Sequence, residues 1–247
     1  MLAILGGSGL SQLSSLTGVR RKAVSTIYGE PSGPLTLGRI GNREVIFLAR
    51  HGDGHTLAPH QVNYRANIRA LKDEGVKEIV SIATVGGIRR DFGPGVLVVP
   101  DQILDYTWGR PATFFEGPGT TVTHIDFTEP YSAALRTRIL AAAAACGEPL
   151  ADGGVYATTQ GPRLETAAEV TRLERDGADL IGMTGMPEAA LAREAGLEYA
   201  AIAVVANHAA GRGDSRHAIS LEQIEEVLGG AMDRVRRILV QLAAEPA

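Results

Sequence analysis

Short runs of apolar and β-branched residues recur along the chain and alternate with stretches in which apolar residues repeat every three or four positions. The runs are almost continuously apolar, which is typical of strands covered on both faces of a sheet. They predict strands at residues 2–5, 44–49, 78–83, 96–100, 154–159, 179–184 and 199–206.

The stretches between these runs predict helices. In the first of them, Tyr64, Ile68 and Leu71 form one apolar stripe that ends at Gly75. Further helices are expected at residues 131–147, 165–177, 187–196 and 220–242. Alternation of strands and helices predicts an α/β fold in three layers, with a mostly parallel sheet between two layers of helices.

Composition narrows the class of protein. The 247 residues contain no Pro/Ser-rich linker, like-charge block or internal repeat, so one domain spanning residues 1–247 is expected. The apolar start is too short for a signal peptide, and no apolar run approaches the ~20 residues of a membrane helix. Cys146 is the single cysteine, and the net charge of −4 gives no overall basic footprint. We expect a soluble, cytoplasmic protein that binds neither membrane nor nucleic acid.

Ligands of such sheets collect at the carboxyl ends of the strands, so the residues after each strand are the candidates for a site. "GGSG" at 6–9 offers backbone N–H groups and the Ser8 hydroxyl to an anion, although a tight turn alone explains it equally. It lacks the Gly-Lys-Ser/Thr of a P-loop. "RHGDGH" at 50–55 offers the planar fork of Arg50 and a ring N–H donor from His51.

Two later turns have similar chemistry. "ATVGGI" at 83–88 contains Thr84, and "GMTGMPEAAL" at 182–191 places Met183 and Thr184 just before a helix, whose N-terminus favours an anion. Turns rich in Gly, Ser and Thr, together with Arg-His, predict one phosphate site assembled from separate strand ends.

His51 leaves alternatives open. With Asp53, His55 and His60 it could ligate a metal, although no cysteine or distant His/Asp cluster completes a set. "RHG" is also compatible with a phosphatase whose histidine is phosphorylated, and a solvated basic turn is the simplest explanation.

Two polar residues lie near other ends of the predicted elements. Glu165, in "TTQGPRLETAAE", falls at or near the first turn of a helix, where the helix dipole favours a carboxylate in any case. Asn207 and His208, in "AAIAVVANHAAG", stand where the last strand is expected to run into a loop.

Together, "AILGGSGL", "RHGDGH…HQVNYRANIRALK", "GPRLET", "GMTGMPE" and "AAIAVVANHAAG" resemble the trimeric purine nucleoside phosphorylase and methylthioadenosine phosphorylase family. The resemblance follows nearly the whole chain in order. It implies an α/β fold with a mixed central sheet and a homotrimer with active sites near subunit interfaces. It also implies metal-free phosphorolysis of a purine nucleoside, with inorganic phosphate as co-substrate and no cofactor.

The resemblance assigns roles position by position. Met183 matches a residue along the ribose, and Glu165 and Asn207 match base-recognition positions. His124, in "HIDFTEPY", matches a segment that reaches the 5′-pocket of a neighbouring subunit. No catalytic role falls to His208. The positions matching the family's phosphate site are Ser8, Arg50, His51, Thr84 and Thr184.

Glu165 and Asn207 separate the two branches of this family. Adenine-specific members have Asp in place of Asn207 and a small hydroxyl residue in place of Glu165, whereas enzymes of 6-oxopurines have Glu and Asn. The Asn207 amide can donate to O6 and accept from N7–H, and the Glu165 carboxylate can accept from N1–H. Adenine would mismatch both contacts, at about 1–3 kcal/mol each. We therefore expect a 6-oxopurine base.

The 5′-position is predicted to be apolar. Where 6-oxopurine enzymes place a histidine against the 5′-hydroxyl, this chain has Leu221, with Ile219 close by. Leucine suits a methylthio group, whereas a shift in alignment would bring His217 there instead. Leu164 stands where the family has an aromatic residue, so base stacking is weaker or comes from elsewhere.

The expected reaction converts 5′-methylthioinosine and phosphate into hypoxanthine and 5-methylthioribose 1-phosphate. Within the family, the alternatives are phosphorolysis of methylthioadenosine or of inosine and guanosine. Outside it, the alternatives are a phosphohistidine-type phosphatase and a purine-binding module without turnover.

Overall fold

The structure of the chain, a computed structural model, describes residues 1–7 and 15–244. The strands are β1 (Leu2–Gly6), β2 (Thr17–Lys22), β3 (Leu35–Ile40), β4 (Arg43–Ala49), β5 (Glu78–Gly87), β6 (Leu97–Val99), β7 (Gln102–Asp105), β8 (Ala151–Asp152), β9 (Val155–Thr158), β10 (Leu180–Gly182) and β11 (Glu198–His208). The helices are α1 (Tyr64–Asp73), α2 (Ala133–Ala145), α3 (Ala167–Arg175), α4 (Glu188–Glu194) and α5 (Leu221–Ala244), with 3-10 turns η1 (Pro59–Gln61) and η2 (Gly213–Ser215).

The strands form one mixed, mostly parallel sheet, which confirms the predicted fold class. Its order is β2-β3-β4-β1-β5-β10-β9-β7, and β11 pairs with both β5 and β6. Parallel ladders join β1 to β4 and β5, and β11 to β5. The antiparallel ladders β2–β3, β3–β4, β5–β10 and β6–β11 lie around this parallel centre.

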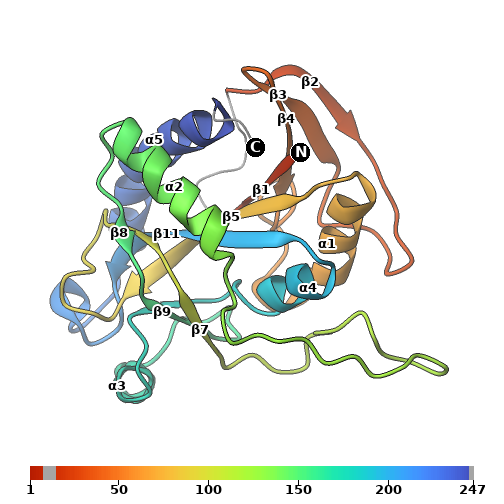
Figure 1. The fold of residues 1–247 in the computed structure, drawn as a ribbon. Coiled ribbons are helices and arrows are strands. Elements are labelled where there is room, and N and C mark those ends of the chain that lie inside the picture. Colours follow the sequence, from red (N-terminus) through yellow and green to blue (C-terminus); the bar gives the residue numbers. More distant parts are fainter. Residues whose placement is uncertain (8–14, 245–247) are drawn as a thin grey trace.

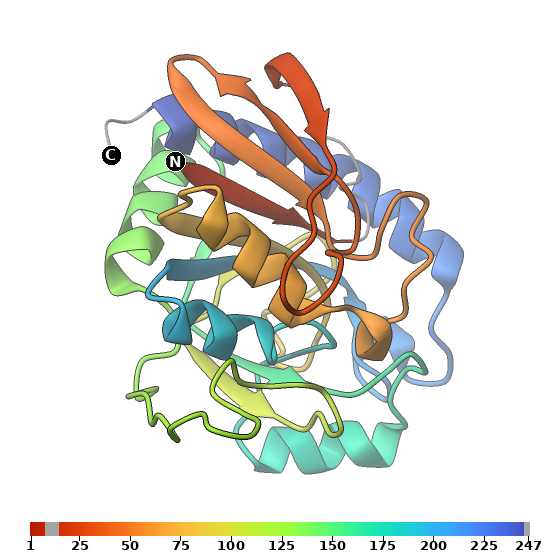
Figure 2. The same cartoon turned by 90° about the vertical axis from the view of Figure 1, so that its right-hand side faces the viewer.

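Helices cover both faces of the sheet, as the continuously apolar strands predict. Figure 1 shows α2 and α5 on one face and α1 and α4 on the other, and Figure 2 shows the same layers turned by 90°. Side chains of β11 alternate between the two sides. Ile202 and Val204 pack with α2 and α5, whereas Tyr199 and Ala201 pack with α1 and α4.

Helix α3 begins two residues later than the sequence pattern predicts. Thr166 is its N-cap: the Thr166 hydroxyl accepts from the Glu169 N–H at 3.1 Å, and the Glu169 carboxylate accepts from the Thr166 N–H at 2.8 Å. This reciprocal capping box fixes the helix start. Glu165 therefore lies in the loop before the helix, outside its first turn.

Two strands extend further than predicted. β5 continues to Gly87 through the turn expected at 83–88, and β11 continues to His208. The register of β11 against β5 shifts between Val205 and Asn207. Asn207 and His208 are therefore the last residues of a strand and not the start of a loop.

The arm, defined as residues 107–128, is a long connection between β7 and α2 that contains neither helix nor strand. It projects from the body of the molecule at the lower right of Figure 1. Its base is anchored, because Phe114 packs with the core between the sheet and α1 and α4.

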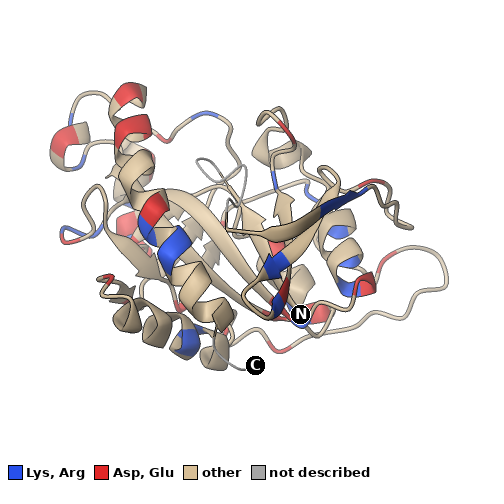
Figure 3. Cartoon of the chain, turned by 90° about the horizontal axis from the view of Figure 1, so that it is seen from above, with Lys and Arg blue, Asp and Glu red and all other residues tan. Residues whose placement is uncertain are grey.

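Charges are unevenly distributed along α5. Acidic residues occupy its first turns, where the helix dipole favours them, and the basic residues lie near its middle, with none in its last turn (Figure 3). Across residues 1–7 and 15–244, no helix has both the length and the apolar character needed to cross a membrane.

Candidate active site

The site lies where β5 changes partner along one of its edges. Residues 78–81 of β5 pair with β1, and Gly86 and Gly87 pair with β10. Between them, residues 82–85 have no ladder partner on that edge among the described strands, while β11 pairs along the other edge. A cavity of about 450 Å³ lies over this interruption.

The cavity brings together residues from five strand ends that are far apart in the sequence. Its lining includes most of the candidates named from the sequence: Arg50, His51, Thr84, Leu164, Glu165, Met183, Thr184 and Asn207. Ser8 lies outside the described residues. The expectation that separate strand ends meet at one place agrees with this arrangement.

Arg50 is fully buried and is held by an ion pair. Its Nε and Nη2 donate to the two carboxylate oxygens of Glu188 at 2.6 and 2.9 Å. Nη2 also donates to Ser81 Oγ at 2.6 Å, and Nη1 donates to the carbonyl of Ile82 at 3.1 Å. A guanidinium has five N–H groups, so within the described chain one Nη1 hydrogen is left for the cavity.

Glu188 is the acceptor around which this corner of the site is built. It is the first residue of α4 and is fully buried. Its Oε1 also accepts from Ser81 Oγ at 2.9 Å and from the Tyr199 hydroxyl at 2.8 Å. Burial works to lower the pKa of Arg50, but the Glu188 carboxylate outweighs it and raises the pKa, so Arg50 stays cationic.

His51 presents an acceptor to its surroundings, where the sequence led us to expect a donor. Its Nδ1 lies 2.8 Å from the carbonyl of Leu57, which can only accept, so Nδ1 carries the proton. Burial and the neighbouring Arg50 charge lower the pKa of His51 to about 4. The ring is neutral at pH 7, and Nε2 therefore has a lone pair.

Met183 and Thr184 follow β10 and line the cavity. Thr184 is buried, and its N–H lies 3.4 Å from the Tyr156 hydroxyl. Gly161 approaches Met183 so closely that a Cβ on Gly161 would lie 2.4 Å from Met183 Sδ, and its φ of +61° also favours glycine. The loop before α3 is thus packed against the turn after β10.

Glu165 is aimed into the cavity from that loop. The Thr159 hydroxyl donates to Glu165 Oε1 at 2.6 Å, which fixes the carboxylate. Burial raises the pKa of Glu165 above its ordinary value, and the Thr159 hydrogen bond opposes this only in part. Leu164 lines the cavity beside it and is 45% exposed.

Asn207 lies near the end of β11, on the opposite side of β5 from Met183. Its Nδ2 donates to the carbonyl of His208 at 2.6 Å. Because a carbonyl can only accept, this bond fixes which amide atom is nitrogen. The second N–H of Nδ2 and the Oδ1 acceptor remain to face the cavity.

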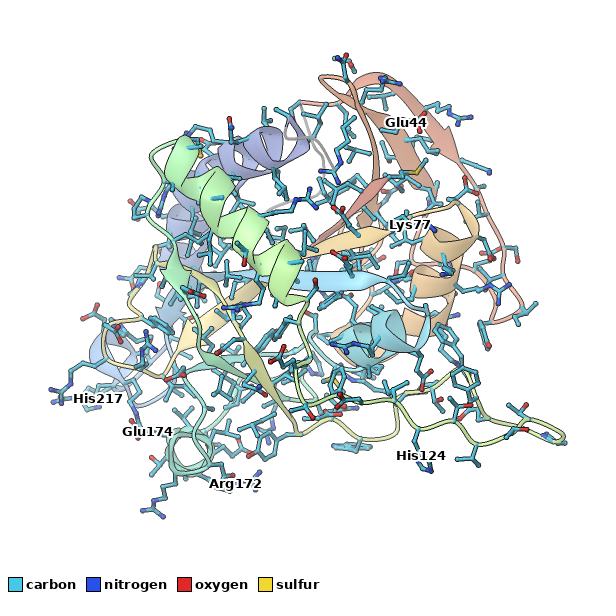
Figure 4. All side chains as sticks on the ribbon, in the orientation of Figure 1. Glu44, Lys77, His124, Arg172, Glu174 and His217 are labelled. Carbon is cyan, nitrogen blue, oxygen red and sulfur yellow. The ribbon has the colours of Figure 1, made fainter. Side chains whose placement is uncertain are left out.

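Two candidates lie away from this cavity. His124 is on the arm, which carries it away from the body of the molecule (Figure 4). Leu221, the first residue of α5, is 68% exposed and lines an adjoining hollow with Leu228 and Met232. Ile219 lines the main cavity, and Ile224 lines both spaces.

His217, the alternative to Leu221, is exposed and lies on the side of the molecule opposite His124 in Figure 4. The residues that could ligate a metal do not form a site either. Asp53 pairs with Arg21, and across the described ranges no three His, Cys, Asp or Glu side chains gather closely enough to hold an ion.

Sequence reasoning missed several residues that build the site. Glu188 is part of the segment "GMTGMPE", but the sequence assigns it no role, because no periodicity links it to Arg50. Thr159 and Arg110 were not singled out, although Arg110 hydrogen-bonds to both loops that border the base side. A single charged residue gives no sign in the sequence that tertiary packing will bury it.

A family model described as "Phosphorylase superfamily" matches residues 1–244 of the chain. A protein of Xanthomonas campestris pv. campestris named "Probable S-methyl-5'-thioinosine phosphorylase" is 54% identical over 226 residues, which cover 92% of this chain and 90% of that protein. The "6-oxopurine nucleoside phosphorylase" of Pyrococcus furiosus is 42% identical over 250 residues, covering 99% and 93% of the two chains.

Solved structures show the same fold. The methylthioadenosine phosphorylase of Schistosoma mansoni in complex with adenine superposes with a TM-score of 0.94. It is 33% identical in sequence, and the match covers 98% of this chain and 90% of that one. Likeness of fold therefore extends to proteins whose names refer to different purine bases.

Proposed function

The chain belongs to the phosphorylase superfamily, and from this we propose that it cleaves 5′-methylthioinosine with phosphate to hypoxanthine and 5-methylthioribose 1-phosphate. The observation that carries the proposal is the placement of Glu165 and Asn207 in the same cavity as Arg50. Base recognition and anion binding then lie at the two ends of one space. Relatives named as thioinosine and 6-oxopurine phosphorylases support the same reaction class.

Phosphate binds at the Arg50 end. Arg50 supplies a charge and an N–H, the Thr84 and Thr184 hydroxyls supply further donors, and Ser8 is expected to join them. Neutral His51 accepts from a protonated phosphate oxygen through Nε2. Bound phosphate attacks C1′ of the ribose, and its negative charge stabilises the oxocarbenium character of the transition state without a protein nucleophile.

The purine departs at the Glu165 end. Asn207 donates to O6 and accepts from N7–H, and Glu165 accepts from N1–H. The bond from Asn207 to O6 strengthens as negative charge develops on the leaving base, and Asn207 Oδ1 accepts from N7–H once N7 has taken up a proton from solvent. Asn207 therefore lowers the barrier as well as selecting the base. Met183 lies along the ribose between the two ends, and Leu164 contacts the base.

The 5′-group faces the apolar residues at the start of α5. Ile219 and Ile224 line the cavity, and Leu221 lines the hollow that adjoins it. A methylthio group gains from such surroundings, whereas a 5′-hydroxyl would be buried without a partner. The chain is expected to act in the cytoplasm as a homotrimer, with His124 of one subunit near this region of the next, and to need no cofactor or metal ion.

Phosphate-dependent release of hypoxanthine tests the reaction class. Incubation of the protein with 5′-methylthioinosine and phosphate should give hypoxanthine and a sugar 1-phosphate, and omission of phosphate should abolish release. Hydrolysis of simple phosphate esters would instead indicate a phosphohistidine-type phosphatase. Purine binding without turnover would indicate a binding module.

A further inference from the structure

Arg110 is a buried cation at the base of the arm, and it contacts the turn after β10. It is 8% exposed. Its Nη1 donates to the carbonyls of Met183 at 2.9 Å and Met186 at 2.6 Å, and lies 3.3 Å from the Tyr64 hydroxyl. The Arg110 guanidinium therefore holds the backbone on both sides of Thr184.

The other nitrogen of the same guanidinium holds the loop before α3. Arg110 Nη2 donates to the carbonyls of Thr159 at 3.2 Å and Gln160 at 2.9 Å. Four carbonyl oxygens, two from each segment, thus converge on one side chain. Without a donor between them these oxygens would repel one another and would lose their hydrogen bonds.

No carboxylate balances the charge of Arg110. Among residues 1–7 and 15–244 it takes part in no ion pair, and its buried Nε has no hydrogen-bond partner. Its Cζ lies 5.5 Å from the centre of the Tyr64 ring. A buried cation that meets carbonyls, a hydroxyl and a ring but no anion is costly for stability alone, so its position calls for another explanation.

Both segments held by Arg110 carry residues that face the nucleoside. Thr159, whose carbonyl accepts from Arg110, donates its hydroxyl to Glu165. Met183, whose carbonyl also accepts from Arg110, lines the cavity and packs against Gly161. The contacts of Arg50 with Glu188, Ser81 and Ile82 involve neither segment.

The geometry points to Arg110 as a positioning residue for the nucleoside. It sets the distance between the Glu165 loop and the Met183 turn, and so determines whether base and ribose fit together. This inference rests on the proposed function of the cavity. Arg110 touches none of the contacts that hold Arg50 and His51, and near the phosphate end it reaches only the backbone beside Thr184. Its loss should therefore weaken nucleoside binding much more than phosphate binding.

The test measures kcat and both KM values for Arg110→Ala and Arg110→Lys in the full-length protein. We expect the KM for methylthioinosine to rise at least about tenfold in Arg110→Ala, with the KM for phosphate changed less than about threefold. Preference for 6-oxopurine over adenine should fall as Glu165 loosens. Added methylguanidinium should restore part of the lost affinity in Arg110→Ala.

Arg65→Ala is the matched control, because Arg65 ties Glu116 of the arm to α1 without touching either loop. It should leave the two KM values unchanged; an equal loss in Arg65→Ala would overturn the proposal, since arm docking would then explain it. Equal rises in both KM values of Arg110→Ala, or no rescue by methylguanidinium, would overturn it too. If Arg110→Ala does not fold, Arg110→Lys, with three donors for four carbonyls, must show the same split in smaller degree.

Calorimetric titration with hypoxanthine separates this inference from the proposed function. If the wild-type protein binds hypoxanthine but catalyses no phosphorolysis, the proposed reaction fails, and weaker hypoxanthine binding by Arg110→Lys than by Arg65→Ala still supports the role of Arg110. Equal binding by these two variants overturns it.

Discussion

Asn207 is fixed by its own backbone before any ligand arrives. Its Nδ2 donates to the carbonyl of His208 at 2.6 Å, so the amide cannot turn over without losing that bond. One N–H and the Oδ1 lone pairs remain, and these are the donor and the acceptor that the proposed contacts with O6 and N7–H of a 6-oxopurine require. An aspartate here would place an anionic oxygen against the same carbonyl.

We predict that Asn207→Asp shifts base preference toward adenine, because a carboxyl oxygen can accept from the 6-amino group. The ratio of kcat/KM for methylthioadenosine to that for methylthioinosine should rise roughly ten- to hundredfold, as expected from a change of one or two buried polar contacts. Asn207→Ala, which removes both groups, should mainly slow turnover. Unchanged kinetics in both variants would remove Asn207 from the site.

Glu165 should impose an acid limit on activity. It must be a carboxylate to accept from N1–H, and burial raises the pKa of its folded form. Activity should therefore be full above that raised pKa and fall as the pH decreases through it, at a higher pH than an ordinary glutamate would give. In a pH profile of kcat/KM, Glu165→Gln should be slow but lack this acid limb. An identical acid limb in Glu165→Gln would assign the titration to another group.

At the scale of single residues, the sequence identified the residues that face the cavity but missed those that hold them in place. Arg50, Glu165 and Asn207 follow strand ends, and that position marks candidates in an α/β sheet. Glu188 and Arg110 act through contacts between segments distant in the chain. Those contacts depend on tertiary packing, which no local pattern encodes. The tautomer of His51 likewise depends on the carbonyl of Leu57.

Among the elements, α4 is tied to the sheet through a buried ion pair. Glu188 at the start of α4 accepts from Arg50, which follows β4, and from Ser81 in β5. Both members of the pair are fully buried. Removing one partner of such a pair leaves an uncompensated charge in the interior.

Glu188→Gln should therefore destabilise the protein by about 3–5 kcal/mol, because the Arg50 charge loses its counter-ion. Urea unfolding at a single protein concentration measures this change. Arg69→Ala breaks the exposed i,i+4 pair with Asp73 and serves as the control, with little or no change expected. Comparable midpoints for Glu188→Gln and the wild type would show that the buried pair contributes little.

The buried strands were predictable because each is a continuous apolar run, and β1, β4, β5 and β11 all lie where those runs stand. β2 was missed because all six of its residues are exposed and three are basic. The extra length of β5 and β11 was missed because glycine and polar residues end a pattern but do not always end a strand. That extra length is what places Asn207 beside Gly86.

At the scale of the whole molecule, the arm is the feature best placed to contact another chain. It projects from the body and carries His124, Val122 and Trp108, of which the last two are 73% and 72% exposed. Exposed apolar side chains on a projecting segment are typical of a contact between subunits.

We predict that sedimentation equilibrium gives a mass three times that of the 26.0 kDa chain. His124→Ala should keep that mass and raise the KM for methylthioinosine, because the 5′-group loses a contact from the neighbouring subunit. A monomer with full activity would exclude a role for the arm in the site.

The most direct test of the proposed function compares kcat/KM for phosphorolysis of 5′-methylthioinosine, 5′-methylthioadenosine and inosine by the same preparation at one phosphate concentration. Glu165 and Asn207 predict that methylthioinosine is preferred over methylthioadenosine, and the apolar residues near the start of α5 predict that it is preferred over inosine. A higher kcat/KM for methylthioadenosine than for methylthioinosine would contradict the assignment of the base.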